Sequence, residues 1–183
     1  MDLRTRLLDL LATRSARRGS FTLASGRQSD LYIDCRPTTM HPEGLTSIGP
    51  LGLAAIGARG WRADSVGGLT LGADPVSYAI AYASQVAGTP LRAFTVRKEA
   101  KTHGTGKLIE GAFEATDRVV VIEDVITTGG SALKAVEAVR AAGAQVVGVL
   151  AVVDREEGGR EAIEATGVAV EALVRAAEIT ARM

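Results

Sequence analysis

The chain has 183 residues, of which 46% are hydrophobic, so it can bury a sizeable core, and we expect one domain over residues 1–183. Lysine plus arginine and aspartate plus glutamate number 21 each. This zero net charge argues against a nucleic-acid partner bound through bulk charge. The single cysteine, Cys35, excludes an internal disulfide and a cysteine metal cluster.

We expect neither a targeting signal nor a membrane-spanning segment. The chain contains no run of ~20 apolar residues, so we expect no transmembrane helix and no membrane partner. The basic residues Arg4 and Arg6 interrupt the first apolar positions, and no signal-peptide pattern follows them. The sequence therefore predicts a cytoplasmic protein.

Three elements are expected in the first third of the chain. The leucines between Leu3 and Leu11 form an apolar stripe, which predicts an amphipathic helix over about 2–17. Two short strands are expected around Ser25 and Gly26, the second over 31–34. The ring of Tyr32 in that strand suits either core packing or a flat ligand. A helix over about 42–59 follows.

The segment 64–75 reads as a short strand that runs into a glycine-rich turn, followed by a helix over about 75–87. Backbone N–H groups of such a turn can bind an anion, because glycines allow a close approach. A tight turn without a ligand remains the alternative. The candidate anion-binding residues are Gly68, Leu69, Thr70, Leu71 and Gly72.

A basic loop is expected over 97–111, after a strand over about 90–96. Four lysines and arginines stand against two glutamates in it, and it contains three glycines. Loops that close over an anion have this composition. A solvated charged loop is the alternative.

The central motif lies between Arg118 and Leu133. An apolar run over 119–122 predicts a buried parallel strand, and two carboxylates, Glu123 and Asp124, follow directly. A turn rich in glycine and hydroxyl groups comes next, and a helix that Gly143 ends follows it. Free N–H groups and the helix dipole favour a phosphate at this turn.

The last third continues with a buried strand over 145–153, a helix to about 166, a strand over 168–174 and a helical tail. Arg155 follows the first of these strands, and ligands in open α/β sheets lie at the carboxyl ends of strands. Its planar guanidinium suits a carboxylate ligand, although a surface arginine is the alternative. Strands and helices alternate from residue 64 onward, so we expect an α/β fold with a central parallel sheet flanked by helices.

The segment 119–131 resembles the phosphoribosyl pyrophosphate (PRPP) binding motif of type I phosphoribosyltransferases. The resemblance implies that Glu123 and Asp124 meet the ribose hydroxyls. It also implies a 5-phosphate loop made of Val125, Ile126, Thr127, Thr128, Gly129, Gly130 and Ser131, and a pyrophosphate loop over 68–72.

The segment 97–104, Arg-Lys-Glu-Ala-Lys-Thr-His-Gly, is similar to the mobile catalytic loop of orotate phosphoribosyltransferases. In that family the loop of one subunit reaches into the neighbouring active site of a homodimer. The resemblance implies that four residues contact pyrophosphate and that Lys101, His103 and Asp124 are catalytic. The four residues are Arg97, Lys98, Lys101 and His103.

The segment 21–29 is similar to the N-terminal segment of the same family, which implies a small hood over about 18–40 that covers the base. Ala24 stands where many members have a lysine. The implied reaction joins orotate to PRPP with Mg²⁺ and gives orotidine 5′-monophosphate and pyrophosphate, with Tyr32, Thr127 and Arg155 at the base. No protein group is expected as a direct metal ligand. There are two alternatives. One is a phosphoribosyltransferase for a different base, and the other is a regulatory PRPP-binding protein without catalysis.

Overall fold

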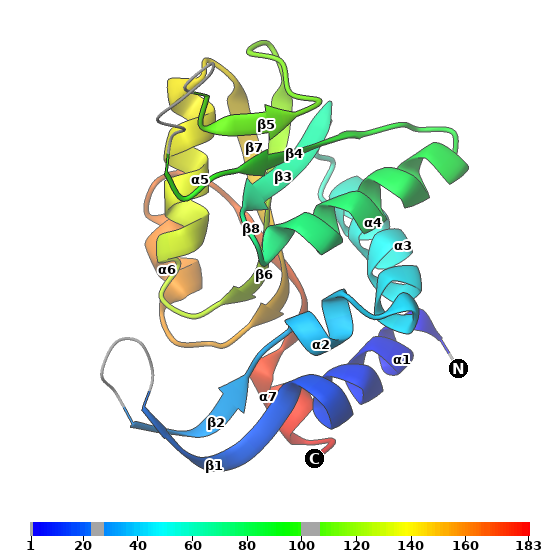
Figure 1. Ribbon diagram of the computed structural model, residues 1–183, viewed down its shortest axis with the longest axis vertical. Helices are drawn as coiled ribbons and strands as arrows, with labels where there is room; N and C mark the ends of the chain where they lie inside the picture. The colour runs from blue at the N-terminus through cyan, green and yellow to red at the C-terminus, as the bar shows by residue number, and fades with distance from the viewer. Residues whose placement is uncertain (1, 23–27, 100–106) are drawn as a thin grey trace.

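The computed structural model describes residues 2–22, 28–99 and 107–183. Its centre is a six-stranded sheet in the order β5-β4-β3-β6-β7-β8, in which β5 alone runs antiparallel to its neighbour (Figure 1). The expected parallel sheet is therefore confirmed. The strands are β3 (Ser65–Leu69), β4 (Arg92–Val96), β5 (Ile109–Gly111), β6 (Arg118–Ile126), β7 (Gln145–Asp154) and β8 (Val170–Arg175).

Helices cover both faces of this sheet (Figure 1). Side chains alternate along a strand, so Val120 and Ile122 of β6 pack in one apolar cluster and Val119 and Val121 pack in the other. Both faces of β6 are buried, which explains its continuous apolar run. The first cluster contains α3 (Pro42–Ala58) and α4 (Ala73–Val86), and the second contains α5 (Gly130–Ala141) and α6 (Gly159–Glu164).

The N-terminal part forms the expected hairpin, from β1 (Ala16–Thr22) and β2 (Gln28–Ile33), which lies apart from the main sheet (Figure 1). The expectation of one helix to residue 17 is wrong. Helix α1 (Leu3–Leu10) passes into a π-helical turn, η1 (Leu11–Ser15), and the chain is extended from Ala16.

The early end of this helix has a tertiary cause. The buried hydroxyl of Ser15 lies 2.7 Å from that of Thr38, and the Ser15 carbonyl accepts the N–H of Asp34 at 2.9 Å. Two short helices, α2 (Arg36–Thr39) and α7 (Ala176–Thr180), complete the fold. Helix α7 packs beside α1, where Glu178 pairs with Arg4 at 2.7 Å.

The expected ends of two elements are also wrong, those of strand β6 and of the 97–111 loop. Strand β6 continues through Val125 and Ile126, which pair with Val153 and Asp154 of β7, instead of ending near Glu123. The end of the expected 97–111 loop is strand β5, paired with β4. Three residues are too few to show a strand periodicity. Within the described ranges, no helix combines the length and apolar character needed to cross a bilayer.

Candidate active site

Two junctions between a strand and a helix form the candidate site. Residues 127–129 connect β6 to α5, and residues 70–72 connect β3 to α4. Strands β3 and β6 are parallel neighbours, so both junctions lie at the same carboxyl edge of the sheet. We call them the acidic junction (residues 123–131) and the neutral junction (residues 68–72).

The acidic junction presents hydroxyls and backbone N–H groups. Gly129 has a φ of +81°, a conformation that favours glycine, and the helix begins at the next residue. Thr128 and Ser131 are exposed, and Thr127 is half-buried. The N–H groups in the first turn of α5 lack intrahelical partners by geometry, so this end of the helix can bind a phosphate.

The two carboxylates of this junction lie in a poorly hydrated environment. Glu123 is 5% exposed, and its burial, together with the adjacent charge of Asp124, raises its pKa well above the ordinary value. Burial also raises the pKa of Asp124, against a hydrogen bond from the N–H of Val125 at 2.9 Å. The environment therefore disfavours two charges here unless a ligand supplies donors or positive charge.

The neutral junction is fixed by one carboxylate. The hydroxyl of Thr70 donates to Asp74 at 2.7 Å, and that of Thr95 on β4 donates to the other carboxylate oxygen at 2.8 Å. The peptide bond between Thr70 and Leu71 is cis. A Cβ atom added to Gly72 would lie 2.5 Å from Oδ1 of Asp124. The two junctions are therefore in direct contact.

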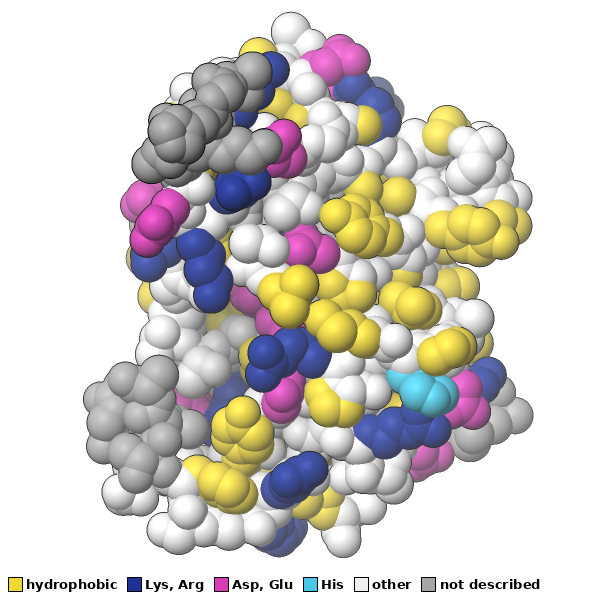
Figure 2. Space-filling view, viewed as in Figure 1, with side chains coloured by type: hydrophobic (Ala, Val, Ile, Leu, Met, Phe, Trp, Pro, Cys, Tyr) yellow, Lys and Arg dark blue, Asp and Glu magenta, His cyan; other side chains and the backbone are white. Residues whose placement is uncertain are grey.

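A cavity of about 300 Å³ lies where they meet. Residues 69–72 form one wall, residues 123–125 with Ser131 form a second, and residues 32–36 of the hairpin end and the start of α2 form a third. Lys98 also lines it. The fold thus brings together Tyr32, both junctions and one cation of the expected loop around one space. On the face in Figure 2, charged side chains are interspersed on the left, and hydrophobic ones gather over α3 and α4.

Arg155 takes a different position from the one expected of a free ligand-binding arginine. Its side chain is 5% exposed and pairs with Glu157 at 2.7 Å, and its Nη2 donates to the Leu31 carbonyl at 3.1 Å. Its buried Nε has no hydrogen-bond partner among the described residues. Arg155 therefore ties the end of β7 to the hairpin, outside the walls of the cavity.

The remaining expected residues divide into described and undescribed ones. Arg97 lies 3.8 Å from Glu110, whereas Lys101, His103 and Ala24 lie outside the described residues. Sequence reasoning missed Asp34 and Arg36 as cavity residues. Their signal was weak, since a carboxylate and an arginine at a strand end are common.

Comparison with known proteins agrees with this geometry. The family model described as "Phosphoribosyl transferase domain" matches residues 76–177. An orotate phosphoribosyltransferase of Bradyrhizobium sp. (strain ORS 278) is 49% identical over 179 residues, which cover 96% of each chain.

Solved structures give the same result. A Mycobacterium tuberculosis orotate phosphoribosyltransferase in complex with Fe(III) dicitrate has a TM-score of 0.85 and 47% identity, covering 97% of this chain and 98% of that one. The M. tuberculosis enzyme in complex with PRPP has a TM-score of 0.79 and 40% identity, covering 97% and 91%. The relatives and the solved structures match nearly the whole chain, the family model matches residues 76–177, and the chain belongs to the orotate phosphoribosyltransferase family of type I phosphoribosyltransferases.

Proposed function

We propose that this enzyme transfers the 5-phosphoribosyl group from PRPP to orotate and produces orotidine 5′-monophosphate and pyrophosphate for pyrimidine nucleotide synthesis. The observation that carries the proposal is the contact of the acidic junction with the neutral junction at one cavity. One side offers carboxylates and a helix N-terminus, and the other offers a backbone turn. PRPP has hydroxyls, a 5-phosphate and a pyrophosphate that match these groups in kind.

The acidic junction binds the ribose phosphate in this proposal. Glu123 and Asp124 accept hydrogen bonds from the ribose hydroxyls, which lowers the cost of keeping buried carboxylates charged. The backbone over 125–131 and the hydroxyls of Thr127, Thr128 and Ser131 hold the 5-phosphate. Because the Ile126 side chain is fully buried, this residue contributes its backbone only.

The reaction breaks the bond between ribose C1 and the pyrophosphate oxygen and forms a bond from C1 to a deprotonated orotate nitrogen. Positive charge develops on the ribose, and negative charge develops on the leaving pyrophosphate. Asp124 stabilises the first, and the loop cations Arg97, Lys98, Lys101 and His103 stabilise the second. Residues 68–72 add backbone donors. Tyr32, which is 40% exposed beside the cavity, and Thr127 orient the base, and Arg155 acts on it through the hairpin that it ties to β7.

Mg²⁺ fits this site as a substrate-bound ion. The available donors are carboxylate oxygens, which are hard ligands, and the described residues contain no group of three or more His, Cys, Asp or Glu side chains placed to hold a metal ion by themselves. Mg²⁺ usually keeps several waters and binds through substrate phosphates with one or two carboxylates. When bound, it neutralises charge on the pyrophosphate. Asp124, a half-buried carboxylate in the cavity wall, would hold such an ion together with the substrate phosphates.

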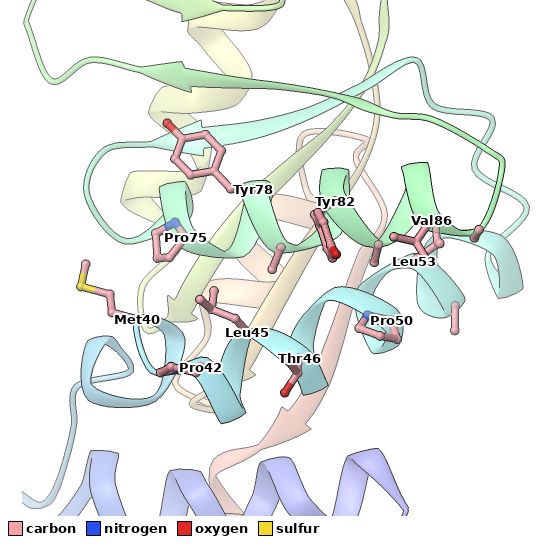
Figure 3. A pocket seen from close by; sticks show the side chains of 14 residues that line it. Met40, Pro42, Leu45, Thr46, Pro50, Leu53, Pro75, Tyr78, Tyr82 and Val86 are labelled. Carbon is pink, nitrogen blue, oxygen red and sulfur yellow. The ribbon is translucent and has the colours of Figure 1, made fainter.

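The proposal includes a homodimer. An apolar groove of about 1060 Å³ runs between α3 and α4, from Met40 at one end to Val86 at the other (Figure 3). Tyr82 is 75% exposed and Val86 is 71% exposed. An exposed apolar surface of this kind marks an interface. A second copy seated there brings its 97–111 loop to this active site.

A cytoplasmic location and the role of the hairpin as a hood over the base also stay predictions.

The reaction is tested by following loss of orotate absorbance with purified protein, PRPP and Mg²⁺. Uracil and a purine base are the controls. We expect consumption of orotate alone. Use of another base would contradict the assignment of Tyr32, Thr127 and Arg155, and PRPP binding without turnover would favour a regulatory role.

Exchange of the loop between subunits is tested by mixing two inactive variants, Lys101→Ala and Asp124→Asn. Each hybrid dimer has one intact site if Lys101 acts across the interface, so random mixing restores about a quarter of the wild-type activity. Lys134→Ala, on the exposed side of α5, is the control for loss of a lysine. Mixtures that stay inactive would place Lys101 in the site of its own subunit.

The interface is tested separately with Tyr82→Asp, which puts a charge into the groove. We expect a monomer by light scattering and a loss of turnover. Leu3→Asp, at a 39% exposed position on α1, is the matched control and stays dimeric. A dimeric Tyr82→Asp protein would contradict this choice of surface.

A further inference from the structure

The neutral junction has a charge deficit for the role proposed above. Residues 68–72 contain no lysine or arginine. The cavity that they line also contains three carboxylates, those of Asp34, Glu123 and Asp124. A leaving pyrophosphate carries several negative charges, so its binding here needs cations nearby.

Two described cations line this cavity, Lys98 and Arg36. Lys98 belongs to the loop that acts across the dimer interface in the proposed function. Arg36 lies at the start of α2, outside that loop, and forms the cavity wall together with residues 69–72. Arg36 is therefore the described cation of the cavity wall that does not belong to the loop.

Arg36 is held in place by an adjacent carboxylate. Its Nε donates to Oδ1 of Asp34 at 2.8 Å, and its Nη2 donates to Oδ2 at 2.9 Å. The backbone N–H of Arg36 donates to Oδ1 at 3.1 Å, and the N–H of Asp34 donates to the Ser15 carbonyl at 2.9 Å. The guanidinium is thus oriented before a ligand arrives, which lowers the entropy cost of binding.

This pair also leaves donors free for a ligand. The Arg36 side chain is 51% exposed, and its Nη1 has no hydrogen bond to any described residue. An exposed ion pair alone contributes little to folding stability. Stability therefore gives a weak reason for this pair, whereas its place in the cavity wall gives a functional one.

We propose that Arg36, oriented by Asp34, binds the pyrophosphate group of PRPP within the same subunit. It supplies the positive charge that the neutral junction lacks, and its free Nη1 donates to a pyrophosphate oxygen. Asp34 is a positioning residue. The proposal rests on the proposed function, because it places pyrophosphate beside residues 68–72.

Calorimetry with two fragments of PRPP tests it without a base. We expect Arg36→Ala to weaken binding of magnesium pyrophosphate by about 10- to 100-fold, the value of a charge-assisted hydrogen bond. Ribose 5-phosphate, which lacks pyrophosphate, should bind within about twofold of wild type, since its contacts lie at the acidic junction. Arg36→Lys should fall between, because lysine keeps the charge and loses the planar fork.

Two further variants sharpen the result. Arg62→Ala removes an exposed arginine near the opposite end of β3 and should leave both affinities unchanged. Asp34→Asn should weaken pyrophosphate binding less than Arg36→Ala, and the double variant should match Arg36→Ala, as expected of residues that act as one unit.

Equal losses for both fragments, or an unchanged pyrophosphate affinity in Arg36→Ala, would overturn the role of Arg36. An equal loss in Arg62→Ala would show a general charge effect and would overturn it as well. The proposed function fails separately, when the wild-type protein binds neither fragment or does not consume orotate.

Discussion

The acidic and neutral junctions have the same architecture and different chemistry. Each connects a parallel strand to a helix at the carboxyl edge of the sheet. The acidic junction presents two carboxylates and several hydroxyls, and burial raises the pKa of both carboxyl groups. The neutral junction presents mainly backbone, held by the bond from Thr70 to Asp74.

In the proposed function, this difference gives two ways to bind one charged ligand. We propose that the buried carboxylates serve the ribose and that the fixed backbone turn serves the pyrophosphate. The two depend on each other, since the absence of a side chain at Gly72 leaves room for the Asp124 carboxylate. Substitutions that act on one junction at a time can separate these contributions.

Asp124→Asn should have the largest effect. The amide keeps the shape and loses the negative charge that stabilises the ribose in the transition state, so we expect kcat to fall by roughly 100- to 1000-fold. Because the side chain is partly buried, loss of its charge should not lower the melting temperature. Orotate consumption and thermal unfolding measure these two effects.

A matched control for this variant is Glu137→Gln, which removes an exposed carboxylate from α5. It should keep full activity. A fall of less than about tenfold in Asp124→Asn, or an equal fall in the control, would contradict the catalytic role of Asp124.

Gly72→Ala should have the second-largest effect. Its added Cβ lies on the neutral junction and would displace the Asp124 carboxylate. Gly72 has a φ of −63°, which alanine adopts readily, so its cost comes from the clash with the carboxylate. We expect kcat/KM for PRPP to fall about 10- to 100-fold and stability to drop by about 1–3 kcal/mol. Steady-state kinetics and urea unfolding give both values.

Gly57→Ala on α3 is the control for the change from glycine to alanine. No atom lies within 4 Å of the added Cβ there, so the variant should be active and slightly more stable. Wild-type kinetics in Gly72→Ala would show that the contact between the junctions has no role in catalysis.

The sequence predicted the elements whose signals are local. The apolar run before Glu123, the glycines of both turns and the helical spacing after residue 131 each act through near neighbours in the chain, and the structure confirms the strand, turn and helix that they predicted. The family model and the relatives confirm the fold class and the family. Individual roles of the site residues stay predictions.

What the sequence did not predict depends on contacts between distant segments. The helix ends at Ser15 because of Thr38 and Asp34, and β6 extends to Ile126 because β7 pairs with it. The meeting of Gly72 with Asp124 exists only after β3 and β6 become neighbours. The bond from Arg155 to the Leu31 carbonyl likewise required the folded chain.

Glu123→Gln should show a smaller effect, on stability and its pH dependence. Burial raises the pKa of Glu123 in the folded state, so the folded protein binds more protons than the unfolded chain above the ordinary pKa of 4.5. The stabilisation is complete below that pKa and is lost as pH rises through the folded-state pKa. Glutamine cannot ionise and avoids this loss.

We therefore expect ligand-free Glu123→Gln to melt a few degrees above wild type at about pH 8, roughly 2–4 °C for each kcal/mol, with the difference closing toward about pH 5. Thermal unfolding followed by circular dichroism at several pH values measures this. A lower melting temperature at every pH would show that the carboxylate stabilises the free protein.

Thr70→Val should have the smallest effect of the four. It removes the hydrogen bond to Asp74, which contributes about 1 kcal/mol, so binding of pyrophosphate should weaken by about fivefold. Thr95→Val is the paired control, because its hydroxyl bonds the other oxygen of the same carboxylate from β4. If the shape of the neutral junction carries its function, Thr95→Val lowers stability and leaves pyrophosphate affinity unchanged, as calorimetry can measure. Equal losses of affinity would instead show that binding depends on the half-buried carboxylate of Asp74, so that the neutral junction would depend on a carboxylate as the acidic junction does.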